Sequence, residues 1–247
     1  MADRAADPGP GAWTRASFAG RLRETLLPRP ETPTHLDQFR LAAVLFFVQF
    51  VAGTPHLVLT LRSKRLGKHA GEVSFPGGRF DPAVDADATD AALREAREEV
   101  GVDPGGVEVV GYLENVHTLT RYCVVPVVAL AKDELEAPRW PLPVSRAEVV
   151  RVALVPLEFF QAARPPVFRQ TAIEFGGRPF PVYSFRWRDL NVWGATAHLI
   201  VSFLRVVGLP GPPASEARRF SPEEILEFVR PETTPRFPVR RRSAGEG

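Results

Sequence analysis

The chain has 247 residues, of which 45% are hydrophobic and 24% are charged, and its formal net charge is +2. These values exclude a disordered chain and are typical of one globular domain with extensions, and the small net charge argues against nucleic acid as a partner. The single cysteine, Cys123, excludes an internal disulfide and a cysteine-based metal cluster, so we expect a cytoplasmic location.

Residues 1–37 are predicted to be an extension, partly disordered. Their one helix-compatible piece, residues 18–27, places Phe18, Leu22 and Leu26 on a shared face that can dock on the core. Arginines at positions 4, 15, 21 and 23 leave an organelle-import peptide as an alternative. No secretory signal is predicted, because no continuous apolar segment follows a basic start.

Strand patterns begin after this extension. The most apolar stretch, Leu41–Gly53, is shorter than the roughly 20 residues that cross a bilayer, so we interpret it as a buried strand and expect no membrane partner. Branched and aromatic residues predict strands at several places, of which the first two are expected to pair: 42–50, 56–62, 107–116, 122–131 and 148–157.

The second half of the chain carries a hairpin signal and a helix signal. Residues 167–175 and 180–187 flank a glycine pair, which predicts a β-hairpin. The spacing of apolar residues over 191–208 predicts a helix that places Trp193 on its buried face. Phe75, in the middle of the chain, is likewise expected in the core.

A short helix and a tail are predicted to follow. Ser221 to Glu224 form a capping-box pattern that opens a helix ending before Pro231. We expect residues 38–230 to form one domain, and the Arg- and Pro-containing tail, 231–247, to be disordered.

The clearest helix spans about residues 89–100, with Asp87 or Thr89 as its N-cap and Gly101 at its end. At 100° per residue, its apolar residues lie on one side, and the other side carries three acids, Glu95, Glu98 and Glu99. These acids repel one another, so the arrangement costs stability unless a cation offsets it.

Arg94 adjoins the acids but cannot neutralise all three. Carboxylates are the ligands of Mg²⁺, which usually also binds phosphate oxygens, so this face predicts a Mg²⁺ or Mn²⁺ site for a phosphate-bearing substrate. A solvated acidic surface is the alternative. The preceding loop, Pro76 to Gly78, favours the metal site, because glycines let the main chain approach a ligand closely; a plain turn is the other interpretation.

Gly78 and the segment Arg94–Val102 together resemble the Nudix box, which has a glycine, an early glutamate and R-E-U-x-E-E-x-G-U, with U apolar. The second half matches at every specified position. The spacing between Gly78 and Arg94 is two positions longer than usual. Ala86 stands where the early glutamate would fall, and its neighbours Asp85 and Asp87 are the candidates to replace it.

The segment before the helix resembles the signature of one Nudix branch, the coenzyme A pyrophosphatases, L-L-T-x-R-S-x3-R-x3-G-x-V-x-F-P-G-G. The residues in register are Thr60, Arg62, Ser63, Gly71, Val73, Phe75, Pro76, Gly77 and Gly78. Gly67 departs from it, since arginine is expected there, and Arg65 or Lys68 could restore the charge. This departure bears on substrate choice and not on the family.

The resemblance implies an α+β fold, a Nudix-type α/β/α sandwich with a mixed β-sheet. It implies metal-dependent hydrolysis of the pyrophosphate of coenzyme A or its thioesters, which gives 3′,5′-ADP and (acyl-)4′-phosphopantetheine. Another nucleoside diphosphate derivative, such as ADP-ribose or a dinucleotide, is an alternative substrate. A non-catalytic binding protein with the same fold is the alternative of another class. A homodimer is compatible with the sequence.

The resemblance also implies roles for individual residues. Glu95, Glu98 and Glu99 would hold the metal, and Glu148 is our candidate for a further ligand from outside the box, with Glu114 as its competitor. Glu95 would be either a ligand or the general base, and Arg94 would orient a glutamate. The residues assigned to the substrate are Arg62, Ser63, Arg65, Lys68, Gly77 and Gly78. No two histidines have the spacing of zinc ligands.

Overall fold

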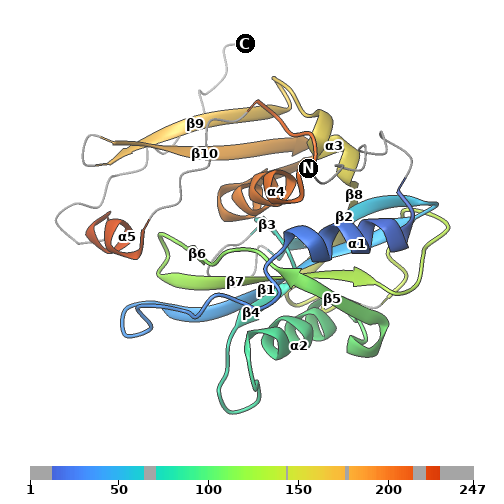
Figure 1. Ribbon diagram of the computed structural model, residues 1–247, viewed down its shortest axis with the longest axis horizontal. Coiled ribbons are helices and arrows are strands. Elements are labelled where there is room, and N and C mark those ends of the chain that lie inside the picture. Colours follow the sequence, from blue (N-terminus) through green and yellow to red (C-terminus); the bar gives the residue numbers. More distant parts are fainter. Residues whose placement is uncertain (1–12, 64–70, 143, 176–177, 214–220, 229–247) are drawn as a thin grey trace, which may run out of the picture.

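The computed structural model describes residues 13–63, 71–142, 144–175, 178–213 and 221–228. At its centre is a mixed eight-stranded sheet (Figure 1). The long apolar strand β1 (Arg40–Val51) lies parallel to β7 (Tyr122–Ala131) and antiparallel to β2 (Thr54–Arg62). The predicted pairing of the first two strands is confirmed.

Shorter strands complete this sheet. β3 (Val73–Ser74) and β8 (Val149–Pro156) pair with β2, and β4 (Gly77–Arg79) pairs with β1. β5 (Val107–Tyr112) and β6 (Val116–His117) both pair with β7.

The prediction of one strand over 107–116 is therefore wrong. The strand is interrupted because the N-terminal extension reaches this edge of the sheet. The backbone N–H of Asn115 donates to a carboxylate oxygen of Glu31 at 2.7 Å, and the Asn115 side chain donates to the Glu31 carbonyl at 3.2 Å.

One face of the sheet is covered by α2 (Ala88–Val100), below the sheet in Figure 1. Asp87 caps its first turn by accepting hydrogen bonds from the backbone N–H groups of Thr89 and Asp90, at 2.7 and 3.0 Å. Gly101 ends it with φ at 74°, a left-handed conformation that suits glycine. Small side chains on its inner face let the helix lie close to the sheet; they are Ala88, Ala91, Ala92 and Ala96.

The other face carries α1 (Arg15–Thr25) and α4 (Gly194–Val207), with a second, three-stranded sheet beyond them (Figure 1). Its strands are β9 (Phe168–Phe175), β10 (Arg178–Trp187) and β11 (Leu190–Trp193). Between the layers, the ring of Phe46 lies 4.4 Å from that of Phe203 and 4.3 Å from that of Phe75. The predicted α/β/α sandwich with a mixed sheet is confirmed, as is the buried position of Phe75, which is 2% exposed.

Trp193 corrects a prediction. It is 46% exposed rather than buried, because it ends β11, opposite Ser184 of β10, and only caps the start of α4. The predicted hairpin is confirmed, since β9 and β10 pair antiparallel; its two glycines, 176 and 177, lie outside the described residues.

The N-terminal helix begins earlier than predicted, with Thr14 as its N-cap. Phe18 and Leu22 are fully buried against the core, and the Nε of Arg15 donates to the carbonyl of Ala131 at 2.6 Å. The helix is thus packed on the domain, whereas residues 1–12 lie outside the described part of the chain.

Three short elements remain: the 3-10 turn η1 (Pro104–Gly106), α3 (Leu157–Ala162) and α5 (Pro222–Phe228). The predicted capping box of α5 forms, because the N–H of Glu224 donates to the Ser221 hydroxyl at 3.2 Å and the N–H of Ser221 to the Glu224 carboxylate at 2.9 Å. The tail, 231–247, lies outside the described residues.

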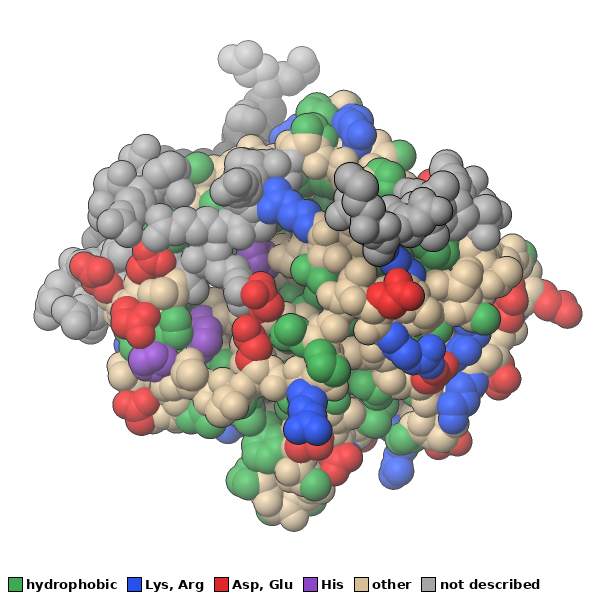
Figure 2. All heavy atoms as spheres, in the orientation of Figure 1, with side chains coloured by type: hydrophobic (Ala, Val, Ile, Leu, Met, Phe, Trp, Pro, Cys, Tyr) green, Lys and Arg blue, Asp and Glu red, His purple; other side chains and the backbone are tan. Residues whose placement is uncertain are grey.

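The described helices include none that is long and apolar enough to span a membrane. On the face shown in Figure 2, Lys and Arg side chains of the described residues are interspersed with Asp and Glu.

Candidate active site

The glycine pair and the acidic helix meet at the edge of β4. The N–H of Gly77 donates to the Oε2 atom of Glu99 at 3.2 Å. The side chain of Glu95 lies against Gly78 so closely that a Cβ atom there would be 2.3 Å from the Glu95 carboxyl carbon. Both glycines therefore contact glutamates of the predicted metal site, one as a hydrogen-bond donor and one by leaving room.

Glu99 is buried, which corrects the prediction that all three acids share a face away from the core. Its side chain is 1% exposed, and its Oε1 atom accepts a hydrogen bond from Nη1 of Arg62 at 2.9 Å. Burial raises the pKa of Glu99 to about 7, although Arg62 and the Gly77 amide oppose the rise. The helical wheel missed this because the two groups that receive the carboxylate come from β2 and β4.

Arg94 organises the exposed side of the cluster. It donates to both carboxylate oxygens of Asp85, from Nε at 2.7 Å and from Nη2 at 3.0 Å. Its Nη1 atom donates to Glu95 at 2.9 Å and to Glu98 at 3.3 Å. A planar guanidinium that is held on one edge presents the other edge in a fixed direction, so Asp85 positions Arg94 and Arg94 positions the two glutamates.

Asp85, next to Ala86 at the position of the early glutamate of the box, is buried against Arg94. Its side chain is 1% exposed, and its Oδ2 atom also accepts the backbone N–H of Asp81 at 2.8 Å. The hydrogen bonds from Arg94 lower the pKa of Asp85 below its ordinary value. Of the two neighbours that could replace the missing glutamate, Asp85 pairs with the arginine and Asp87 caps the helix.

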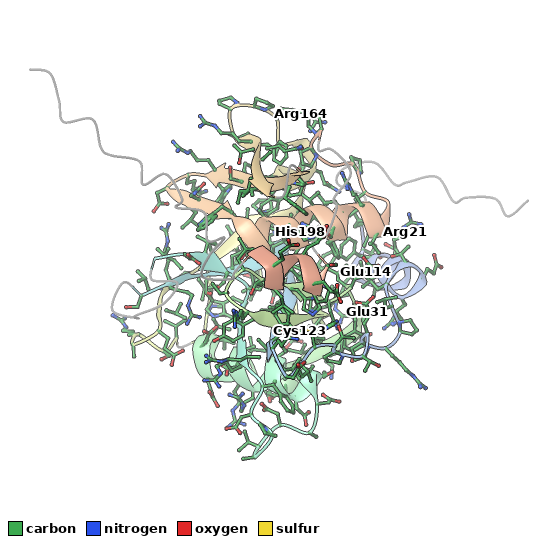
Figure 3. All side chains as sticks on the ribbon, turned by 90° about the vertical axis from the view of Figure 1, so that its left-hand side faces the viewer. Arg21, Glu31, Glu114, Cys123, Arg164 and His198 are labelled. Atoms are coloured by element: carbon green, nitrogen blue, oxygen red, sulfur yellow. The ribbon has the colours of Figure 1, made fainter. Side chains whose placement is uncertain are left out.

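Glu148 is brought to the cluster by a contact between strands. The N–H of Ser63 donates to the carbonyl of Glu148 at 2.7 Å, at the end of the β2–β8 pair. The charge of Glu148 raises the pKa values of Glu95 and Glu99, after burial as the main cause in both. Its competitor Glu114 lies elsewhere, near the level of α1 and α4 in Figure 3, whereas α2 is at the bottom of that view.

Carboxylates are the donors that a hard divalent cation takes. In addition to burial, the charges of Glu98 and Glu148 raise the pKa of Glu95, and those of Glu95 and Glu148 raise the pKa of Glu99, so the four carboxylates lie near one another. Among the described residues, no three His, Cys, Asp or Glu side chains are already arranged to hold a metal ion. Three of the carboxylates instead accept hydrogen bonds from Arg62 or Arg94. A cation would thus take over oxygens that arginines now contact.

Two of the residues assigned to the substrate, Arg65 and Lys68, lie outside the described residues. Arg62 contacts the Glu99 carboxylate, and the backbone of Ser63 contacts the backbone of Glu148. Sequence reasoning assigned Arg62 to the substrate and missed its contact with Glu99. No local signal could have revealed it, because the two residues are 37 positions apart.

A scan of family models found the NUDIX domain over residues 39–176, which is more than half of the chain. The chain belongs to the Nudix family. Among curated proteins, this Nudix chain is 38% identical over 183 residues to the Escherichia coli K12 protein "Uncharacterized Nudix hydrolase NudL", covering 74% of the chain and 91% of that protein.

Solved Nudix structures resemble the chain more distantly. RenU from M. smegmatis, described as a Nudix hydrolase, has a TM-score of 0.40 at 20% identity, covering 49% of this chain and 72% of that one. A MutT/nudix family protein from Enterococcus faecalis has a TM-score of 0.41 at 18% identity, covering 79% and 70%. Because these scores are low, membership rests on the family model and the sequence match.

Proposed function

We propose that this Nudix protein hydrolyses the diphosphate bond of a nucleoside diphosphate derivative with Mg²⁺ or Mn²⁺, and that coenzyme A or its thioesters are the substrates. The observation that carries the proposal is the cluster of Glu95, Glu98, Glu99 and Glu148 beside the glycine turn. So many carboxylates at one place repel each other, and a pure binding module has no evident need for them.

In the proposed reaction, a water oxygen attacks one phosphorus and the bond from that phosphorus to the bridging oxygen breaks. The bridging oxygen leaves with the electron pair, and the proton of the water goes to Glu95. Glu95 suits this role because burial raises its pKa towards neutrality, and because Arg94 fixes its direction. A metal held by Glu98, Glu99 and Glu148 would supply positive charge at the diphosphate oxygens.

Coenzyme A is favoured by the resemblance of residues 58–78 to the signature of that branch. The positions of Arg62 and Ser63 support a role for this segment in the site, because both adjoin cluster residues. Gly67, where the signature has arginine, favours the alternative of ADP-ribose or a dinucleotide.

The test is incubation of the purified protein with coenzyme A, ADP-ribose and a dinucleotide, each with Mg²⁺, with Mn²⁺ and with EDTA, followed by chromatography of the products. We expect 3′,5′-ADP from coenzyme A with either metal and no product with EDTA. Cleavage of ADP-ribose or the dinucleotide alone would overturn the substrate assignment. Metal-independent binding with no product from any of them would favour the binding module.

A further inference from the structure

Arg62 is the positively charged partner of the Glu99 carboxylate. Its Nη1 atom lies 2.9 Å from the Oε1 atom of a carboxylate that is only 1% exposed, while the arginine side chain itself is 21% exposed. Glu95 and Glu148 both act on the same carboxylate with like charge. A buried carboxylate in such a field needs a positive partner, and the structure supplies the guanidinium.

The backbone of Arg62 is held by hydrogen bonds, and its side chain is partly exposed at 21%. The N–H of Arg62 donates to the carbonyl of Glu72 at 2.9 Å, and its own carbonyl accepts the N–H of Gly71 at 3.2 Å. The register between β2 and β8 shifts between Leu61 and Arg62. Such bulges redirect a side chain and are frequent beside active sites. The irregularity therefore directs the side chain of Arg62 toward the carboxylates, while its backbone stays hydrogen-bonded.

The contacts of this guanidinium are incomplete. Within the described part of the chain, the Nε atom of Arg62 is buried and has no hydrogen-bond partner. A buried donor without an acceptor is costly and therefore rare. A phosphate group presents oxygens that can accept from Nε and Nη together. The unpaired edge of Arg62 is thus suited to an anion.

We propose that Arg62 is an exchangeable counter-ion: it neutralises Glu99 while the metal is absent, and it turns to a phosphate oxygen of the substrate once the metal has taken Glu99. This inference rests on the proposed function. The exchange makes substrate affinity depend on the metal, since the guanidinium becomes free only when a stronger cation replaces it. Arg62 would thus weaken the binding of the metal and strengthen the binding of the substrate.

The test measures metal and substrate separately in Arg62→Gln, Arg62→Lys and a matched control, Arg97→Gln. Arg97 is an exposed residue of α2, so its variant makes the same change in net charge. Mn²⁺ affinity is measured by electron paramagnetic resonance without nucleotide, at the same pH of about 8.5 for every variant, well above the ordinary pKa of a carboxyl group. Michaelis constants are measured with the diphosphate that the wild type cleaves best.

We expect Arg62→Gln to bind Mn²⁺ about tenfold more tightly and to show a Michaelis constant raised about tenfold, because it removes both a competitor and a phosphate contact. Arg62→Lys should lie between this variant and the wild type, and it serves if Arg62→Gln does not fold. Arg97→Gln should change either value less than twofold. A merely structural role would weaken both ligands.

Unchanged or weaker Mn²⁺ binding by Arg62→Gln would overturn the inference, as would an unchanged Michaelis constant. A wild type that cleaves no diphosphate would instead refute the proposed function. In that case the Mn²⁺ titration alone would still decide whether Arg62 competes with a metal for Glu99.

Discussion

Two adjacent glycines should give different defects when each is replaced by alanine. A Cβ atom on Gly78 would lie 2.3 Å from the carboxyl carbon of Glu95 and 2.4 Å from its Oε1 atom. Only the end of a flexible side chain has to move, by about 1 Å, to restore an ordinary separation. A Cβ atom on Gly77 would instead lie 2.4 Å from the carbonyl oxygen of Ala43 and 2.6 Å from the Cα of Val44, which belong to a central strand.

Gly78→Ala should therefore lose activity and keep its stability. Displacement of a catalytic group by 1 Å costs about 10²-fold in turnover, and we expect the melting temperature to stay within about 2 °C of the wild type. Gly77→Ala should lower the free energy of unfolding by about 2 kcal/mol, which corresponds to a melting temperature about 4–8 °C lower.

The assay is metal-dependent cleavage of the best diphosphate substrate together with differential scanning fluorimetry of the same samples. If Gly78→Ala kept its turnover within threefold of the wild type, Glu95 could not be the group whose position limits the reaction. Equal losses of melting temperature in the two variants would show that the glycines support the fold in the same way, against the contacts described above.

The carboxylates themselves give three further predictions. Glu95→Gln and Glu98→Gln should each lower turnover about 10²-fold or more with little change in melting temperature, and turnover within tenfold of the wild type in both would contradict their roles. Asp85→Asn should lower the free energy of unfolding by about 2 kcal/mol, because the bond to Arg94 loses its charge, and should also slow turnover; denaturant unfolding and kinetics on one preparation test this. Burial raises the pKa of Glu99 from 4.5 to about 7. In EDTA, the free energy of unfolding of the wild type should therefore fall by roughly 3 kcal/mol, relative to Glu99→Gln, as pH increases through that interval. The same change of melting temperature with pH in both proteins would contradict this prediction.

The sign of the last effect follows from burial. The folded state holds the proton of Glu99 more tightly than the unfolded state, so this group stabilises the fold at low pH and the contribution is lost as pH rises through the folded pKa. The pKa of Asp85 shifts in the opposite direction, because it is bound to Arg94, so its contribution is lost on acidification. Comparing the pH dependence of the free energy of unfolding of Glu99→Gln and of Asp85→Asn with that of the wild type separates the two contributions.

The network around Arg94 includes Asp85, a neighbour of the position where the Nudix box has its early glutamate. The loop before α2 is longer than in the usual box, and Asp85 in this loop reaches Arg94 with both carboxylate oxygens. In this chain Asp85 thus makes the contact that holds the arginine in place. Asp87, two positions later, instead caps the first turn of the helix.

The sequence by itself determined the fold family and the composition of the candidate site. The Nudix-like segment from Arg94 to Val102, the helix limits at Asp87 and Gly101 and most strands follow from local pattern and capping chemistry, which depend on neighbours within a few positions. The tertiary structure decided which acid is buried, which cation reaches it and that Trp193 is exposed. Those outcomes depend on strand register and long-range packing. Glu99 is enclosed because β2 brings Arg62 and β4 brings the Gly77 amide to the same carboxylate. A contact between residues so far apart in the sequence leaves no trace in the local periodicity of the helix.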